Sequence, residues 1–354
     1  MGVGAPRRAR AGARTGRALR IAAMYMDGTA AAYYRAILPL RELERRGHRV
    51  LWPARHDYRR LLAEPSSFDV LLMHHHCGEE DLELVRQLTR QGVAVVWDED
   101  DDISATPRHA PVYRKNGGRR GMKRAFARSV EIAATANLMT TPSAHLAGRY
   151  RELGVEHAEV IENHVAQEHV GLERPRHQGV VIGITAAGEH AVDFKKLRID
   201  RVLKRLLEAH EGVRVVTIGW GHELPTNRHS HVTRVAIEEL IATERQFDIG
   251  LAPLADTAFS RARSNVKLKE YAAAGAMWLA SPVGPYLGMG EQQGGMLVRD
   301  GEWYAALERF VLDFRARTQL MEQARAWAPT QSADRAAGQW EAALTGAVAR
   351  ARAG

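Results

Sequence analysis

A lysine and a glutamate spaced three residues apart lie in the part of the chain best suited to bind a nucleotide. Lys267 and Glu270 follow a loop that contains Arg263, Ser264 and Asn265. At the start of a helix, free backbone N–H groups and the positive end of the helix dipole favour anions such as a diphosphate. Residues three apart share one helical face, so Glu270 is placed to accept hydrogen bonds from ribose hydroxyls. We therefore predict a nucleotide-diphosphate site here.

The residues around this loop predict the elements that position it. The apolar run from 249 to 252 is typical of a short buried strand. A helix is expected from Asn265 to Ala274, ended by Gly275, and a second apolar strand from 277 to 280. A strand, a loop that opens a helix and another strand form a parallel crossover unit. The alternative is an ordinary amphipathic helix with scattered charges.

Alternating strands and helices extend over nearly the whole chain and predict an α/β fold. One series begins at Leu19 and a second at Gly179, separated by a polar linker from 164 to 178. We expect two Rossmann-like, doubly wound parallel-sheet domains that face each other across a cleft. The expected boundaries are a basic tail at 1–18, an N-terminal domain at 19–165, a C-terminal domain at 178–330 and a final helix within 331–354. Further strands are expected at 19–24, 50–52, 70–73, 93–97, 137–140, 159–162, 179–184 and 213–218, and helices at 31–46, 81–91, 122–136, 143–153, 195–210, 235–243 and 332–351.

The segments FDIGLAPL, SNVKLKEYAAAG and ASPVG, between Phe247 and Gly284, resemble the donor-binding stretch of GT-B glycosyltransferases of the group 1, or family 4, type. That group reads roughly D-I-G-L-A-P-L, then S-x-x-K-x-x-E-Y-x-A-x-G, then A-S-P-V-G. The resemblance implies that Lys267 contacts the donor diphosphate and that Glu270 holds the ribose. Retaining members carry a second glutamate eight positions earlier, where this chain has Ala262, so retention and inversion both stay open. The resemblance also implies the two-domain fold and a final helix that crosses back onto the first domain.

Residues after three other predicted strands extend the candidate donor site. Gly28 allows close backbone approach, and the matching turn of the family faces the donor diphosphate or the acceptor. A helix N-cap formed by Asp27 or Thr29 is the alternative for this turn. The N–H groups of the loop at Thr185 could cradle phosphate, and Gly219 ends a strand from which it could approach the base.

Tyr34 and a run of three histidines are candidates for the acceptor side. Ligands bind at the carboxyl ends of parallel strands, where these residues are expected. Adjacent residues of an extended segment point to opposite sides, so only His74 and His76 of the run could share a ligand. We favour histidines that line the cleft and contact a sugar hydroxyl over a metal site.

The acidic run from Asp98 to Asp102 admits three interpretations. Asp-x-Asp is typical of GT-A glycosyltransferases, in which the acids hold a metal ion against the donor diphosphate. Some GT-B enzymes of the surface-polysaccharide type show a similar run, which implies an acidic patch near the acceptor. A solvated helix start is the third possibility. Asp100 is a candidate for acid/base catalysis.

These residues together predict a hexosyltransferase-type enzyme that uses a nucleotide-diphospho-sugar as co-substrate and needs neither metal nor cofactor. Lys267, Arg263 and helix-end amides would stabilise the charge that collects on the leaving diphosphate. The acceptor is expected to be a glycan or a small molecule. The rivals are a metal-dependent GT-A-like transferase built on Asp98–Asp102, a catalytically inactive nucleotide- or glycan-binding protein, and a transferase that acts on modified DNA.

Composition and charge add weaker constraints. The formal net charge is +8, and six arginines between Arg7 and Arg20 leave about +2 for the rest of the chain. We expect the tail to be disordered, with a possible weak contact to an anionic membrane or nucleic acid. No apolar run reaches the roughly 20 residues of a membrane-spanning helix. The single cysteine, Cys77, is typical of a reducing compartment, so a cytoplasmic, possibly membrane-peripheral, protein is expected. The sequence gives no indication of the oligomeric state.

Overall fold

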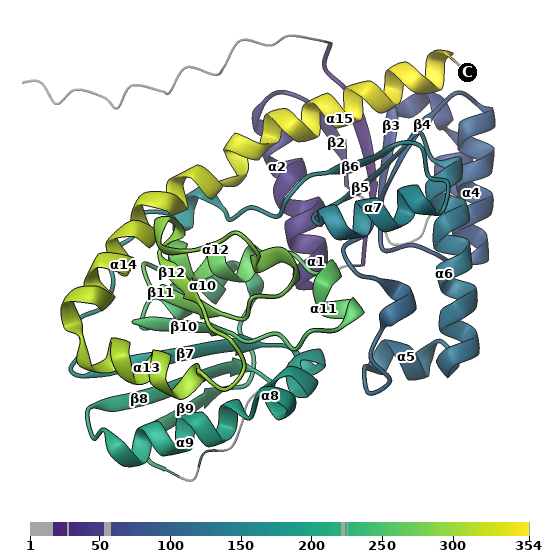
Figure 1. Cartoon of the computed structure of the whole chain (residues 1–354). Coiled ribbons are helices and arrows are strands. Elements are labelled where there is room, and N and C mark those ends of the chain that lie inside the picture. Colours follow the sequence, from purple (N-terminus) through teal and green to yellow (C-terminus); the bar gives the residue numbers. More distant parts are fainter. Residues whose placement is uncertain (1–16, 27, 53–57, 221–223, 225, 354) are drawn as a thin grey trace, which may run out of the picture.

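Two parallel β-sheets, each covered by helices on both faces, form the core of two domains (Figure 1). The computed structural model describes residues 17–26, 28–52, 58–220, 224 and 226–353. Residues 1–16 of the basic tail and Asp27 lie outside the described residues. The predicted α/β fold with two Rossmann-like domains is confirmed.

The first sheet has the strand order β2-β1-β3-β4-β5-β6, with neighbouring strands parallel. Its central strands are mostly apolar because helices cover both faces, and His74 and Asp98 stand at the ends of β3 and β4. One face packs on α4, α6 and α7, and the other on α2 and the C-terminal helix α15. The elements are β1 Arg20–Met24, α1 Ala30–Ala32, α2 Leu38–Arg45, β2 Arg49–Leu51, α3 Tyr58–Ala63, β3 Val70–His74, α4 Glu79–Arg90, β4 Ala94–Asp98, α5 Pro111–Lys115, α6 Gly118–Thr135, β5 Leu138–Thr141, α7 Ala144–Glu152 and β6 Ala158–Val160.

The second sheet has the order β12-β11-β10-β7-β8-β9 and is also parallel. Helices α8, α9 and α13 cover one face, and α10 and α12 cover the other. A Cβ added at Gly250 would lie 2.4 Å from the Tyr271 ring, so this strand glycine lets α12 sit close to the sheet. The elements are β7 Val180–Ala186, α8 Ala191–Leu197, α9 Ile199–Ala209, β8 Val213–Gly219, β9 His229–Val232, α10 Leu240–Glu244, β10 Ile249–Ala252, α11 Ala258–Ala262, α12 Val266–Ala273, β11 Met277–Ala280, β12 Gly295–Leu297, α13 Trp303–Leu312, α14 Phe314–Trp327 and α15 Ala333–Ala353.

Two predicted helices differ in detail from those observed. The helix expected at 31–46 contains a π-helical turn, Tyr33–Ile37, between α1 and α2. Such turns occur as local bulges inside α-helices. The helix expected at 195–210 is two helices, because Arg198 adopts a left-handed backbone with φ of 53° and separates α8 from α9. Strands β9 and β12 and helices α3, α5, α11, α13 and α14 have no counterpart among the predicted elements.

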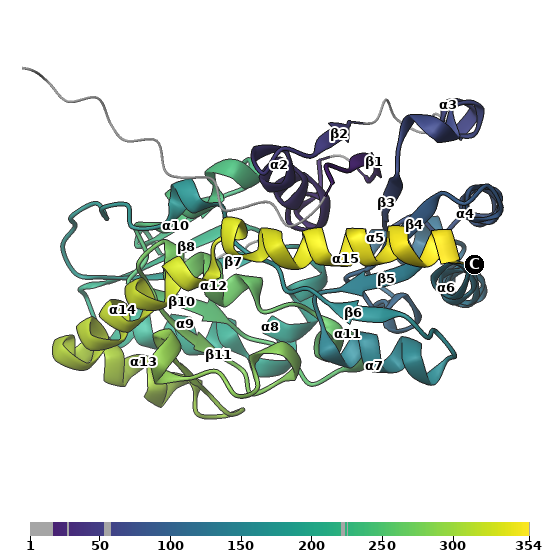
Figure 2. The same cartoon turned by 90° about the horizontal axis from the view of Figure 1, so that it is seen from above.

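The C-terminal helix joins the two domains from outside. Helix α14 packs on the second domain, and α15 then runs over the first-domain sheet (Figure 1). From above, α15 lies along the length of the first domain (Figure 2). Where the chain returns, Val165 donates its N–H to the Gln331 carbonyl at 3.0 Å, and Ala333 donates to the Val165 carbonyl at 2.9 Å. The two segments that connect the domains, one at Val165 and one at 331–333, therefore lie side by side.

In the part of the chain that the structure describes, the helices are all too short or too polar to cross a lipid bilayer. The longest, α15, has 21 residues, but it contains the charged residues Asp334, Arg335, Glu341, Arg350 and Arg352.

Leu344→Ala should destabilise the protein by about 2–5 kcal/mol, because loss of a buried leucine costs transfer free energy and leaves a cavity. Leu344 is fully buried where α15 meets the first-domain sheet. Urea or thermal unfolding measures the change. The exposed neighbour Thr345 is the control, since Thr345→Ala should stay within about 0.5 kcal/mol of the parent. Equal losses in the two variants would contradict this packing.

Candidate functional site

The strand orders determine where a ligand can bind. In a doubly wound sheet, ligands bind beyond the carboxyl ends of neighbouring strands whose connections run in opposite directions. Strands β7 and β10 are such neighbours, because the chain leaves β7 toward β8 and β10 toward β11. The end of β7 with the segment that follows it, at 185–190, and the start of α12 with the segment before it, at 263–270, line a cavity of about 360 Å³ between the domains. Tyr34 and Asp100 line it from the first domain.

The predicted pair at the start of α12 lies in this cavity (Figure 1 shows α12 beside the first domain). Lys267 Nζ is 2.7 Å from Glu270 Oε2, and the Tyr34 hydroxyl donates to Glu270 Oε1 at 2.6 Å. Burial, and then the nearby Glu270, raise the pKa of Tyr34 well above its usual value, so its hydroxyl stays a donor. The structure thus brings together two predicted donor-side residues and one predicted acceptor-side residue.

Glu244 lies behind this pair, and the sequence analysis missed it. Its side chain is fully buried on α10 and accepts a 2.5 Å hydrogen bond from the Thr185 hydroxyl. Among the described residues its other oxygen has no hydrogen-bond partner. Burial first, and then Glu270, raise the pKa of Glu244 to about 8, although Lys267 opposes the shift. Glu244 is therefore protonated at neutral pH.

The loop before α12 presents two of its three predicted residues to the cavity. Arg263 and Ser264 line it, and the Arg263 guanidinium lies 3.3 Å from Glu189 Oε1. Asn265 does not line this cavity, because its side-chain amide donates to Glu162 Oε2 at 3.2 Å. The helix start keeps its positive character, since the first turn of α12 contains no acidic residue.

A second lysine of α12 forms hydrogen bonds between the two domains. Lys269 is fully buried and donates to Glu162 Oε2 at 2.7 Å and to the Asn163 carbonyl at 2.8 Å. The Asn163 amide in turn donates to the Ser264 hydroxyl at 3.2 Å. Burial lowers the pKa of Lys269, and Glu162 opposes that shift. Only tertiary structure reveals this contact, because Glu162 and Lys269 lie in different domains.

The residues of the acidic run Asp98–Asp102 make different contacts. Asp98 is buried and binds Arg35 at 2.6 Å and Thr140 at 2.6 Å. Glu99 accepts from the backbone N–H groups of the two residues that follow it, and Asp102 caps the 3-10 turn Ile103–Ala105. Asp100 and Asp101 line the cavity. Burial and the neighbouring Asp100 raise the pKa of Asp101 to about 7.

The expected geometry of the histidine run is wrong. The segment is not extended, because His75 adopts a left-handed backbone with φ of 63°. The rings of His74 and His75 therefore stack, with centroids 4.5 Å apart. His76 turns away, with Nδ1 3.2 Å from Asp81, and His74 Nδ1 lies 2.8 Å from Asp98. Neither His74 nor His76 lines the interdomain cavity described above.

Of the remaining donor-side candidates, two line the cavity and one does not. Thr185 and Gly219 line the cavity, and a Cβ added at Gly219 would lie 2.4 Å from the Ala186 carbonyl oxygen. With φ of 83°, this position favours glycine on backbone grounds as well. Gly28 does not line the cavity. Thr29 caps α1 by accepting from the Ala32 N–H at 3.0 Å, which is the alternative foreseen for this turn.

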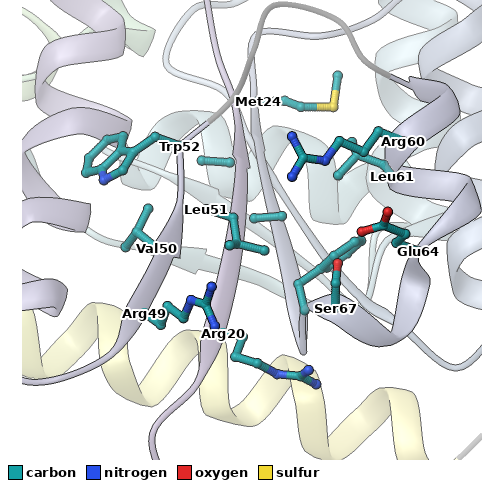
Figure 3. A pocket seen from close by; sticks show the side chains of 13 residues that line it. Arg20, Met24, Arg49, Val50, Leu51, Trp52, Arg60, Leu61, Glu64 and Ser67 are labelled. Atoms are coloured by element: carbon teal, nitrogen blue, oxygen red, sulfur yellow. The ribbon is translucent and has the colours of Figure 1, made fainter.

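A second cavity, of about 500 Å³, lies beside β1 and β2 in the first domain (Figure 3). Arg20, Arg49 and Arg60 surround a floor of apolar side chains. Arg20 is already paired with Asp69 at 3.0 Å. None of the predicted site residues lines this cavity. We therefore place the candidate site between the domains, where cations, carboxylates and a helix start converge.

Solved structures resemble the chain in fold, whereas no protein-family model and no curated protein matches its sequence. An alpha-glucosyltransferase in complex with UDP and a 13-mer DNA containing an HMU base is 10% identical, with a TM-score of 0.67 over 93% of this chain and 100% of the other. HepE of Anabaena, in complex with UDP and glucose, is 12% identical, with a TM-score of 0.63 over 92% and 99%. A putative UDP-N-acetylglucosamine 2-epimerase from Listeria monocytogenes is 11% identical, with a TM-score of 0.56 over 93% and 96%.

These likenesses show that the chain has the GT-B fold. The alternative of a GT-A-like transferase is therefore wrong. The acidic run on which it rested does not form one cluster, because Asp98 and Asp102 are engaged away from the cavity. Since the matches include both transferases and an epimerase, the fold alone does not determine the reaction.

Glu244→Gln should change how stability depends on pH. The folded pKa of Glu244, about 8, lies above the usual value near 4.3, so the folded state holds an extra proton between these values. Its stabilising contribution is complete at low pH and is lost as the pH rises toward 8. Glutamine removes this loss, so the variant should gain up to about 1.4 kcal/mol per pH unit relative to the parent between pH 5 and 8.

Thermal unfolding at pH 5, 6.5 and 8 measures this difference. Glu208→Gln, on the exposed face of α9, is the matched control and should track the parent at each pH. A constant offset between Glu244→Gln and the parent would mean that Glu244 is ionised throughout.

Proposed function

We propose that the chain is a hexosyltransferase-type glycosyltransferase that moves a sugar from a nucleotide-diphospho-sugar to a glycan or small-molecule acceptor. The observation that carries this proposal is the Lys267–Glu270 pair at the start of α12, inside the cavity between the domains. Several structures with the same fold were solved in complex with UDP, which makes UDP the first nucleotide to test.

The roles follow from the chemistry of each group. Lys267, Arg263 and the free N–H groups of α12 hold the diphosphate and stabilise the charge that develops as the sugar leaves. Ser264 adds a hydroxyl donor, whereas the hydroxyl proton of Thr185, which also lines the cavity, is already donated to Glu244. Glu270 accepts from the ribose. Because Glu270 binds Tyr34 in the free protein, nucleotide binding replaces this contact with one to the ribose.

The diphosphate is proposed to bind without a metal ion or other cofactor. The carboxylates that line the cavity on the first-domain side are Asp100 and Asp101, whereas Lys267 and Arg263 belong to the second domain. Fixed cations and helix-end amides can provide the stabilisation that a metal ion gives elsewhere.

We assign the acceptor to the first-domain wall of the cavity. Ala262, at the position of the second glutamate of retaining enzymes, is fully buried against the first domain and offers no carboxylate. Asp100, Asp101 and Tyr34 are the polar first-domain groups available to an acceptor hydroxyl. Modified DNA is a second candidate acceptor, favoured by the fold shared with the alpha-glucosyltransferase solved with DNA and by the arginines of the tail. A duplex affinity that falls steeply with salt and is lost on deletion of residues 1–18 would support it.

Lys267→Ala should lower the rate of sugar transfer roughly 10²–10³-fold, because it removes one preorganised cation from the leaving diphosphate. It should also weaken UDP binding. The parent should gain about 2.7 kcal/mol of stability at a UDP concentration 100 times the dissociation constant, which a thermal shift detects. A screen of UDP, GDP, dTDP and ADP sugars identifies the donor.

Lys204→Ala is the matched control, because Lys204 lies exposed on α9 in the same domain. It should leave nucleotide affinity unchanged. If no nucleotide diphosphate stabilises the parent, the proposed function is wrong. Nucleotide binding without transfer or donor hydrolysis over many acceptors would instead support the inactive binding protein.

Removal of metal ions with EDTA should leave the affinity for the nucleotide diphosphate within about twofold, since the proposed contacts are made by side chains and backbone amides alone. Isothermal titration calorimetry before and after chelation measures it. Nucleotide affinity that collapses on chelation and returns with Mg²⁺ or Mn²⁺ would contradict binding by protein cations.

A further inference from the structure

Two histidines and an aspartate meet at the carboxyl ends of β3 and β4. One nitrogen each of His74 and His75 and one oxygen of Asp100 lie within 4.8 Å of one another. The prediction that the histidine run holds no metal assumed an extended segment. That assumption does not hold, because His75 has a left-handed backbone and the rings of His74 and His75 stack on each other.

His74 has the environment of a metal-binding imidazole. Its Nδ1 lies 2.8 Å from the Asp98 carboxylate, which accepts its proton and leaves the lone pair on Nε2. Arg35 and Thr140 hold Asp98 in place from the other side. The His74 side chain is only 1% exposed, yet its Nε2 has no hydrogen-bond partner among the described residues. A buried polar atom without a partner is costly and calls for a ligand.

His75 Nε2 faces two carboxylates at once. It lies 2.6 Å from Asp100 Oδ1 and 2.7 Å from Glu99 Oε1. Neither His75 Nε2 nor Asp100 Oδ1 has a hydrogen bond of acceptable direction to any described residue. A left-handed backbone at a residue other than glycine is strained, and such strain is concentrated at functional sites.

We propose that His74, His75 and Asp100 bind a divalent transition-metal ion, with Glu99 as the nearest further carboxylate. Two imidazoles and a carboxylate suit Zn²⁺, Co²⁺, Ni²⁺ or Fe²⁺, whereas Mg²⁺ and Ca²⁺ prefer sites built from oxygen. Asp100 lines the interdomain cavity, so the ion lies at the first-domain wall of that cavity. The proposal does not depend on sugar transfer, because the ion and the proposed diphosphate site belong to different domains.

Calorimetric titration of Zn²⁺ and Co²⁺ into the chelator-treated full chain, without a polyhistidine tag, tests this site. We expect one ion per chain, no competition from Mg²⁺, and visible absorption from bound Co²⁺. His74→Gln, His75→Asn and Asp100→Asn should each weaken the affinity about a hundredfold or more and abolish the Co²⁺ spectrum. His157→Ala, which removes an exposed histidine from the same domain, should change neither.

His75→Asn separates binding from folding, because asparagine tolerates the left-handed backbone but is a poor ligand for these ions. Its far-UV circular dichroism and metal-free melting temperature should match those of the parent. A parent that binds no Zn²⁺ or Co²⁺, or an affinity and Co²⁺ spectrum that survive both His75→Asn and Asp100→Asn, would overturn the proposal. In that case the three side chains form only an ion pair around a protonated His75.

Discussion

The buried ion pair between Arg35 and Asp98 organises the first-domain wall of the site. Both side chains are fully removed from solvent, and such a pair persists only when further hydrogen bonds satisfy its remaining atoms. Arg35 also donates to the Asn163 side chain at 2.9 Å and to the Ile161 carbonyl, and it lies 5.1 Å from the centre of a Trp340 ring. One guanidinium thereby connects the π-helical turn, the end of β4, the segment after β6 and α15.

The second wall of the site depends on the unequal charge of two neighbouring carboxyl groups. Glu244 and Glu270 lie close enough to influence each other, and burial keeps the proton on Glu244. Glu270 lies 2.7 Å from Lys267 Nζ and lines the cavity. One glutamate is thus a buried neutral group that accepts from Thr185, and the other faces the cavity. Environment rather than residue type decides which task each performs.

Much of the architecture could be predicted because its signals are local. Buried parallel strands such as the one at 70–73 are continuous apolar runs, and the three-residue spacing of Lys267 and Glu270 places both on one helical face. The left-handed backbones at His75 and Arg198 carry no comparable signal, since this conformation is uncommon for any residue other than glycine. Glu244 and the Lys269–Glu162 contact were missed because burial and partners arise only when distant segments pack together.

The hydroxyl of Tyr34 links the two domains. It reaches from the first domain to the carboxylate oxygen of the second domain to which we assign the ribose contact. If ribose hydroxyls take this oxygen, the bond between the domains is exchanged for a bond to the nucleotide. Nucleotide affinity is then linked to the strength of that interdomain bond.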